Sequence, residues 1–287
     1  MMQSEQEGQR NLQQSGAAGQ RNTQHATNIK KRSMRRKKAR RMRRIKRIFV
    51  AAIILLVVFS AGRTSFVQGF LNHWNVKSEA TLTAEGYPES LVQLYEKNEE
   101  ARQFVLDYKK NGNNEQPIDI SSDVTDGKIP LFLQWDERWG YRTYGDNFLA
   151  ITGCGPTALS MVYVGLTGDT SMNPYAVAQM AQEDGFYVNG SGSAWSMMTE
   201  LATKLGLSAQ ELSLNEDSIR QELSQGHPII CIMGPGDFTT SGHFVVLTGV
   251  DSEGKITVND SNSKKNSNKA WKIEDLMSQI RDLWVYQ

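Results

Sequence analysis

Two uninterrupted apolar runs in the C-terminal half of the chain restrict its fold most. Residues 228–233 and 243–250 have the length of buried strands, and residues 255–259 return as an alternating strand after a turn at 251–254. Helical patterns come earlier, at residues 156–163, 173–181, 193–205 and 215–225, and short apolar stretches at 130–134 and 283–286 read as further strands. Helices followed by hairpin-linked strands predict an α+β fold with an antiparallel sheet.

A cysteine between two glycines begins the first of these helices. Pro156 fits the first turn of a helix, which places Cys154 at the helix N-terminus, where the partial positive charge favours a thiolate. Gly153 and Gly155 leave room for another backbone, such as that of a bound peptide, to approach the sulfur. A small buried cysteine at a tight turn has the same local pattern. The second cysteine, Cys231, lies inside an apolar run and reads as a core residue, with a Cys154–Cys231 disulfide as the alternative.

A histidine and an aspartate stand where they could serve such a thiolate. His243 opens the most apolar strand, and an imidazole can take a thiol proton and later protonate a leaving amine. Asp260 ends the strand that pairs with the His243 strand, so a hairpin brings the two side chains together. Asn259 points to the opposite strand face and is the reserve candidate for the third member of the set.

The first part of the chain differs sharply in charge from the rest. Residues 1–47 carry 15 Lys and Arg side chains against two acidic ones, a net charge of +13, whereas the remainder carries −12. This polar and then basic arm is expected to be disordered, because it has too few apolar residues to build a core. Its basic block alone could bind nucleic acid, but the apolar segment directly after it favours a topology signal instead. We therefore expect no nucleic-acid partner.

Residues 48–70 are predicted to form a single transmembrane anchor, with the 1–47 arm in the cytoplasm. A cleaved signal peptide is the alternative, and a lipoprotein anchor is excluded because this segment has no cysteine. Both readings leave the rest of the chain outside the cytoplasm, and the anchor reading places it at the cell membrane. Residues 71–128 read as a helical stalk and polar linker, and residues 129–287 are long enough for one domain with its own core.

Four motifs carry a resemblance to a known family. They are Gln-Trp-Asp-Glu-Arg-Trp at 134–139, Gly-Cys-Gly-Pro-Thr at 153–157, Gly-His-Phe-Val-Val-Leu-Thr-Gly at 242–249 and Val-Asn-Asp at 258–260. Together they resemble papain-like cysteine peptidase family thirty-nine, the double-glycine, bacteriocin-processing peptidases and their stand-alone relatives. The resemblance covers roughly residues 129–287, and with the anchor it suggests a stand-alone, membrane-anchored member.

The resemblance implies a papain-like fold, in which a helix that carries the cysteine packs on an antiparallel sheet that carries the histidine. It implies that Cys154 is the nucleophile, His243 the general base and Asp260 the carboxylate that orients the ring. Family members that process peptides typically place a glutamine about six residues before the cysteine, as an oxyanion-hole donor. Phe148 stands there instead. Asn147 and Gln134 are the candidates for a second donor beside the backbone N–H of Cys154.

The expected function is a membrane-anchored, extracytoplasmic cysteine peptidase that hydrolyses peptide bonds of a peptide or protein substrate. We expect no cofactor, and no metal, because two cysteines and scattered histidines do not have the spacing of a zinc site. A catalytically weak or inactive peptide-binding module on the same scaffold is one alternative. A cell-wall amidase or transpeptidase that uses the same thiol is another. The relatives that work in export are fused to transporter and ATPase domains, so leader processing coupled to export is not implied.

Overall fold

A five-stranded antiparallel sheet forms the centre of residues 77–287, the part of the chain that the computed structural model describes. Its strands, in spatial order, are β5 (Ala209–Glu211), β9 (Ile280–Tyr286), β6 (Ile229–Met233), β7 (His243–Val250) and β8 (Ile256–Asp260). Every neighbouring pair in this order is antiparallel. The predicted mixed fold with an antiparallel sheet is therefore confirmed.

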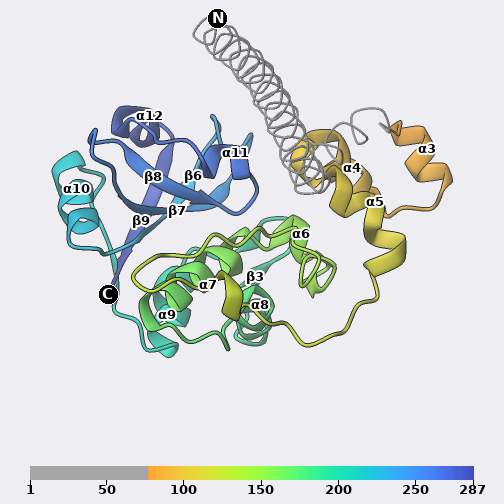
Figure 1. The fold of residues 1–287 in the computed structure, drawn as a ribbon, viewed down its shortest axis with the longest axis horizontal. Helices are drawn as coiled ribbons and strands as arrows, with labels where there is room; N and C mark the ends of the chain where they lie inside the picture. The colour runs from red at the N-terminus through yellow and green to blue at the C-terminus, as the bar shows by residue number, and fades with distance from the viewer. Residues whose placement is uncertain (1–76) are drawn as a thin grey trace, which may run out of the picture. The chain divides into compact units, whose positions relative to one another are not determined.

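Helices cover both faces of this sheet (Figure 1). From Cys154 to the end of the chain the helices are α7 (Cys154–Thr167), α8 (Pro174–Glu183), α9 (Met197–Lys204), α10 (Glu216–Ser224), α11 (Lys264–Ser267) and α12 (Ile273–Met277). One core joins α7, α8 and α9 to one face of the sheet, through Ile230 and Phe244 among others. A second core joins α10 and α12 to the opposite face, through Ile229, Cys231 and Val245. Because successive strand residues point to opposite faces, burial on both sides explains the unbroken apolar run of β6.

Two short hairpins in the first half differ from the predicted elements. β1 (Thr143–Tyr144) pairs with β2 (Asn147–Phe148), and β3 (Tyr187–Val188) pairs with β4 (Gly192–Ser193). Because residues 192 and 193 are used in that second hairpin, the helix predicted over 193–205 begins only at Met197. The strand predicted over 130–134 is wrong as well: this segment is an extended loop held by single hydrogen bonds, such as the one from Gln134 N to Ser261 O (2.8 Å).

A helical segment precedes the domain and packs against it. Its elements are α3 (Glu79–Ala84), α4 (Glu89–Lys97), the 3₁₀ turn η1 (Glu99–Ala101), α5 (Arg102–Asn111) and the 3₁₀ turn η2 (Ser121–Asp123). A third core joins α3, α4, η1 and α5 to the short helix α6 (Leu149–Thr152) and to the aromatic loop before it, through the buried Trp135, Tyr141 and Ala150. Tyr141 also donates a hydrogen bond from its hydroxyl to Phe104 O (2.6 Å). Residues 77–287 consequently form one unit.

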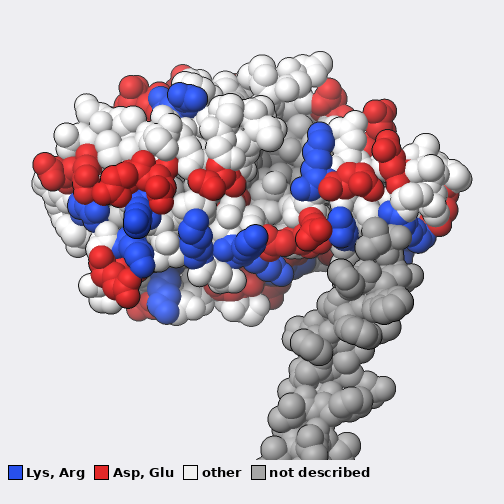
Figure 2. All heavy atoms as spheres, turned by 90° about the horizontal axis from the view of Figure 1, so that it is seen from above, with Lys and Arg blue, Asp and Glu red and all other residues white. Residues whose placement is uncertain are grey.

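Acidic and basic side chains are interspersed over the face drawn in Figure 2. Among residues 77–287 no helix combines the length and the apolar character that crossing a bilayer requires. The predicted arm at 1–47 and the predicted anchor at 48–70 lie outside the described residues.

Candidate active site

Cys154 is the first residue of α7, the most deeply buried helix of the domain. Apolar side chains line α7 on nearly all sides, so its position is fixed by the core rather than by a loop. Gly168 ends the helix in the left-handed conformation, with φ of 71°. The thiol of Cys154 is therefore presented, half-buried, from a rigid helix N-terminus.

The glycines that flank Cys154 have a different role from the predicted one. A Cβ atom on Gly155 would lie 2.7 Å from Ser193 Oγ, and one on Gly153 would lie 2.5 Å from Leu149 O. The protein's own side chains and backbone thus fill the space next to both glycines. The expectation that they leave room for a bound peptide is wrong, because these glycines let α7 pack closely on β4 and α6.

His243 and Asp260 come from neighbouring strands and are in direct contact. His243 is the first residue of β7, and Asp260 is the last residue of β8. In the sheet register Asp260 lies opposite Val245, two residues after His243. The His243 Nε2 atom lies 2.7 Å from Asp260 Oδ1. Both side chains are nearly inaccessible to water, with exposed fractions of 6% and 1%. Low solvent exposure strengthens the attraction between the two groups.

The carboxylate of Asp260 is held from all sides by hydrogen-bond donors. Oδ1 also accepts from the backbone N–H of Asn262 (2.8 Å), and Oδ2 accepts from Asn266 Nδ2 (2.8 Å). Burial on its own would raise the pKa of Asp260, but the His243 ring and these amide donors together hold it below its ordinary value. Asp260 therefore stays ionised and fixed in orientation.

The thiol of Cys154 and the ring of His243 form the other half of the arrangement. Burial by itself would raise the pKa of Cys154, but a hydrogen bond and charge from His243, with the N–H groups of Phe244 and Gly155, lower it below its ordinary value. Burial would lower the pKa of His243, but hydrogen bonds to Asp260 and Cys154 raise it to about 10. Since Nε2 is taken by Asp260, Nδ1 is the ring nitrogen left for the thiol. These shifts favour a thiolate–imidazolium pair.

Cys231 lies in a contrasting environment at the centre of β6. It is fully buried in the second core, and burial, followed by the nearby charge of Asp282, raises the pKa of its thiol far above the ordinary value. Both Cys154 and Cys231 are free thiols, so the alternative of a disulfide between them is wrong.

The remaining predicted site residues, Asn259, Gln134 and Asn147, differ in what their side-chain amides contact. Asn259 donates from Nδ2 to the carbonyls of Ile129 (3.1 Å) and Pro130 (3.0 Å) on the other side of the strand, away from His243. Gln134 does not line the cavity that contains Cys154, and its Nε2 donates to Ala150 O (2.7 Å). Asn147 does line the same cavity as Cys154, and its Oδ1 accepts from the adjacent Phe148 N, which leaves Nδ2 for another partner.

A cavity of about 570 Å³ opens next to the thiol and the ring. Residues 190–193, 232–234 and 241–244 form much of its wall. Trp195, 47% exposed, and Arg281 also line it, and within residues 77–287 the Arg281 side chain makes no hydrogen bond or ion pair. No group of three His, Cys, Asp or Glu side chains in the same part of the chain is arranged to hold a metal ion.

Sequence reasoning did not find the residues that hold the segment after Asp260 in place. The carboxylate of Glu100, on η1, accepts from Ser263 Oγ (2.6 Å) and from the backbone N–H of Lys264 (2.9 Å) at the start of α11. The same helix carries Asn266, which holds Asp260. Ser263, which caps α11, was a visible signal for a helix start, but nothing local indicated a partner more than 160 residues away.

Two comparisons with known proteins found a similarity. The family model described as "Peptidase_C39 like family" matches residues 127–287. A solved structure, the peptidase domain of Streptococcus ComA, described as a bi-functional ABC transporter involved in a quorum sensing pathway, is similar at 19% identity. The match covers 47% of this chain and 89% of that chain, with a TM-score of 0.36. No curated protein matches. Since the family model spans more than half of its residues, the chain belongs to the Peptidase_C39-like family.

Proposed function

We propose that this protein is a cysteine peptidase that hydrolyses peptide bonds with Cys154, His243 and Asp260. The observation that carries the proposal is the position of the His243 ring. It is bound to a buried carboxylate through Nε2, and it lines the same cavity as Cys154, whose pKa it lowers. All three groups are fixed by secondary structure, and the cavity beside them has room for a peptide.

In the proposed reaction, the Cys154 thiolate attacks the carbonyl carbon of the scissile peptide bond. The C–N bond breaks as the His243 imidazolium gives its proton to the leaving amine, and an acyl thioester on Cys154 remains. Neutral His243 then takes a proton from water, and the resulting hydroxide displaces the thiolate and releases the new carboxylic acid. Asp260 keeps the ring oriented and stabilises its charged form at each step, without being protonated itself.

The negative oxygen of each tetrahedral intermediate needs hydrogen-bond donors. The backbone N–H of Cys154, in the first turn of α7, is suited to be one donor. Asn147 Nδ2 is the best candidate for the second, since Asn147 lies on the cavity wall and Gln134 is already engaged. A side-chain amide at this place would take over the task of the family's glutamine, whose position is held by Phe148.

The proposal is tested by labelling with an electrophile in the full-length protein. An iodoacetamide probe should label the wild type and Cys231→Ala equally, and should fail to label Cys154→Ala. Incubation of wild type with a synthetic peptide library, read by mass spectrometry, should then yield cleaved products that Cys154→Ala does not yield. Normal labelling without any cleaved peptide would leave binding as the function. Absence of labelling in the native wild type would refute the proposal that Cys154 is a reactive thiolate.

A peptide-binding module without efficient catalysis is the second candidate, and one observation favours it. Phe148 cannot donate a hydrogen bond, and its ring packs edge-on against Tyr108 at a centroid distance of 5.5 Å. That side chain is therefore part of the third core rather than of an oxyanion hole. Loss of one such donor costs about a hundredfold in rate.

We further propose that the anchor predicted at 48–70 holds this domain on the outer side of the cell membrane. The net charge of +13 before it supports that orientation. External protease on intact cells should remove an epitope tag placed in the domain and spare one placed near the N-terminus. The reverse pattern would show that the domain lies in the cytoplasm and would refute the proposed orientation.

A further inference from the structure

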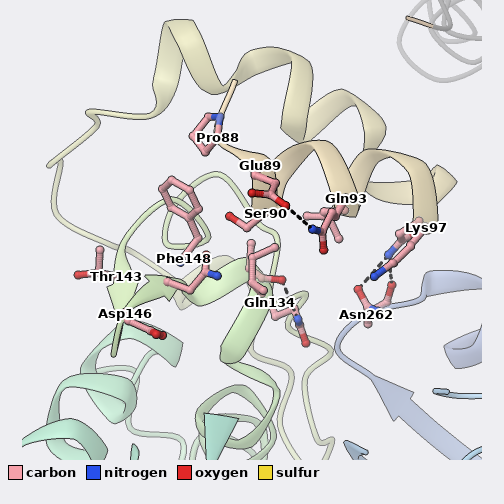
Figure 3. A pocket seen from close by; sticks show the side chains of 15 residues that line it. Pro88, Glu89, Ser90, Gln93, Lys97, Gln134, Thr143, Asp146, Phe148 and Asn262 are labelled. Atoms are coloured by element: carbon pink, nitrogen blue, oxygen red, sulfur yellow. Dashed lines mark hydrogen bonds between the residues drawn. The ribbon is translucent and has the colours of Figure 1, made fainter. Parts of the chain in front are cut away.

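A second and larger cavity, of about 720 Å³, lies against the helical segment (Figure 3). One wall is α4, which contributes Ser90 and Lys97, and the other is formed by Phe148 and Asn262 from the domain. The wall on the α4 side belongs to residues that precede the family match at 127–287. This cavity is thus absent from a chain reduced to the family's own part.

The two cavities are neighbours that share three residues. Asp146, Asn147 and Ile151 line both of them. These residues belong to the β1–β2 hairpin and to α6, which lead directly into Cys154. A chain that lies in the cavity beside Cys154 and passes the hairpin would therefore enter the second cavity.

The walls of the second cavity are fixed in advance of any ligand. Asn98, at the end of α4, donates from Nδ2 to Asn262 O (2.8 Å) and to Asn262 Oδ1 (2.9 Å), which ties the helix to the loop after Asp260. The other side of α4 is packed into the third core through Leu91 and Tyr95. A preformed wall lowers the entropic cost of binding.

The chemistry of the lining fits an extended polypeptide. Leu94, Phe148 and Ile151 offer apolar surface for a side chain. Ser90 and Lys97 offer polar groups that make no hydrogen bond through their side chains to other described residues, so a peptide backbone can use them. The cavity thus combines apolar surface for a side chain with free polar groups for a peptide backbone, as binding sites do.

We propose that this second cavity binds the substrate polypeptide on one side of the scissile bond. α4 then contacts substrate residues that the peptidase domain alone cannot reach. The inference rests on the proposed function, because it assumes that the chain beside Cys154 is the substrate. The occupant is an unfolded segment long enough to pass the β1–β2 hairpin. The enzyme then favours long substrates over minimal ones.

The test blocks the cavity in the full-length protein. Ser90→Trp puts a large ring into it, and Glu96→Trp, at an exposed site on the same helix outside the lining, is the matched control. The substrates are a synthetic library of long, unstructured peptides and a two-residue fluorogenic amide that reaches only the cavity beside Cys154. Thermal unfolding of both variants checks that α4 keeps its packing.

Ser90→Trp should lower cleavage of the long peptides about tenfold or more and alter sequence preference on one side of the scissile bond only. It should leave cleavage of the short amide and iodoacetamide labelling of Cys154 unchanged, and Glu96→Trp should change nothing. Equal losses on long and short substrates, or no loss on either, would overturn the proposal.

Failure of the proposed function gives a different result. The wild type would then cleave neither substrate and Cys154 would not be labelled. In that case the same library is applied to immobilised Cys154→Ala, with and without Ser90→Trp. Weaker retention in the double variant would support the cavity as a peptide site without catalysis, and equal retention would refute it.

Discussion

The two cysteines of this chain occupy regions that differ in burial and, above all, in the charged groups beside the thiol. Cys154 stands at the N-terminus of α7 with His243 beside it, and Cys231 lies in the middle of β6 among apolar side chains. The pKa of Cys154 is lowered although burial acts to raise it, whereas burial raises the pKa of Cys231 unopposed by any cation. A positioned charge can thus outweigh burial in setting the pKa of a thiol.

The largest expected difference between these two regions is their rate of alkylation. Near neutral pH, iodoacetamide should modify Cys154 about a hundredfold or more faster than Cys231, as measured by mass spectrometry of the digested protein. The lowered pKa means that the Cys154 thiolate is present above that value and is lost as the pH falls through it. His243→Ala should move the onset of labelling up towards the ordinary thiol pKa of about 8.5. Similar alkylation rates at both cysteines would contradict the inference that His243 activates Cys154.

The next largest effect is expected from the residue that holds the ring. Asp260→Asn should lower kcat/KM about a hundredfold or more, because the ring loses its orientation and the stabilisation of its charged form. Cys154 should remain open to alkylation in this variant. Asn259→Ala, one residue away on the same strand, should keep turnover, since Asn259 contacts the loop at 129–130. If the Asn259 variant were the damaged one, the third member would be misassigned.

A smaller effect should appear in the pH profile of kcat/KM. Turnover should rise as the pH passes the lowered pKa of Cys154 and should fall above about pH 10, where the His243 imidazolium loses its proton. Asp260→Asn should move the falling limb to lower pH, because the carboxylate contributes to the raised pKa of His243. A falling limb at the same pH in both proteins would show that another group sets it.

The smallest effect on activity is expected from the buried cysteine. Cys231→Ala should keep wild-type kcat/KM while lowering the free energy of unfolding by roughly 1 kcal/mol, because it leaves a small cavity in the second core. Cys154→Ala should do the opposite, abolishing turnover with little change in a urea unfolding curve. Loss of turnover in a folded Cys231→Ala protein would show that the two regions are coupled.

The sheet and the members of the Cys154–His243–Asp260 arrangement could be predicted because strand lengths, strand ends and the turn at 251–254 are local signals. The exact register has a second cause that the sequence pattern did not predict. The pairing of β7 with β8 shifts between Leu247 and Gly249, and this shift puts Asp260 opposite Val245 and on the same strand face as His243. The helix start at Cys154 follows from the glycine–proline pattern around it. The catalytic roles of these residues remain the proposal that the labelling experiment tests.

The contributions that sequence reasoning missed depend on long-range packing. Gln134 and Asn147 looked equivalent as donors, and only the path of the loop between them shows that Gln134 is bound to Ala150 while Asn147 lines the cavity. Ser193 was predicted to open a helix, but its pairing with Tyr187 keeps it in a strand. No periodicity in the sequence reports which carbonyl a side-chain amide will meet.

The contact of Glu100 with the start of α11 has a consequence for where this protein can be divided. A recombinant fragment that begins at residue 127 would contain the full family match, yet it would lack Glu100 and Asn98 and would expose the aromatic side chains of Trp135 and Tyr141. The segment after Asp260 would then fluctuate, and its amide protons would exchange with solvent at rates typical of a frayed helix end. The compact unit of this structure, residues 77–287, therefore begins about 50 residues before the family match.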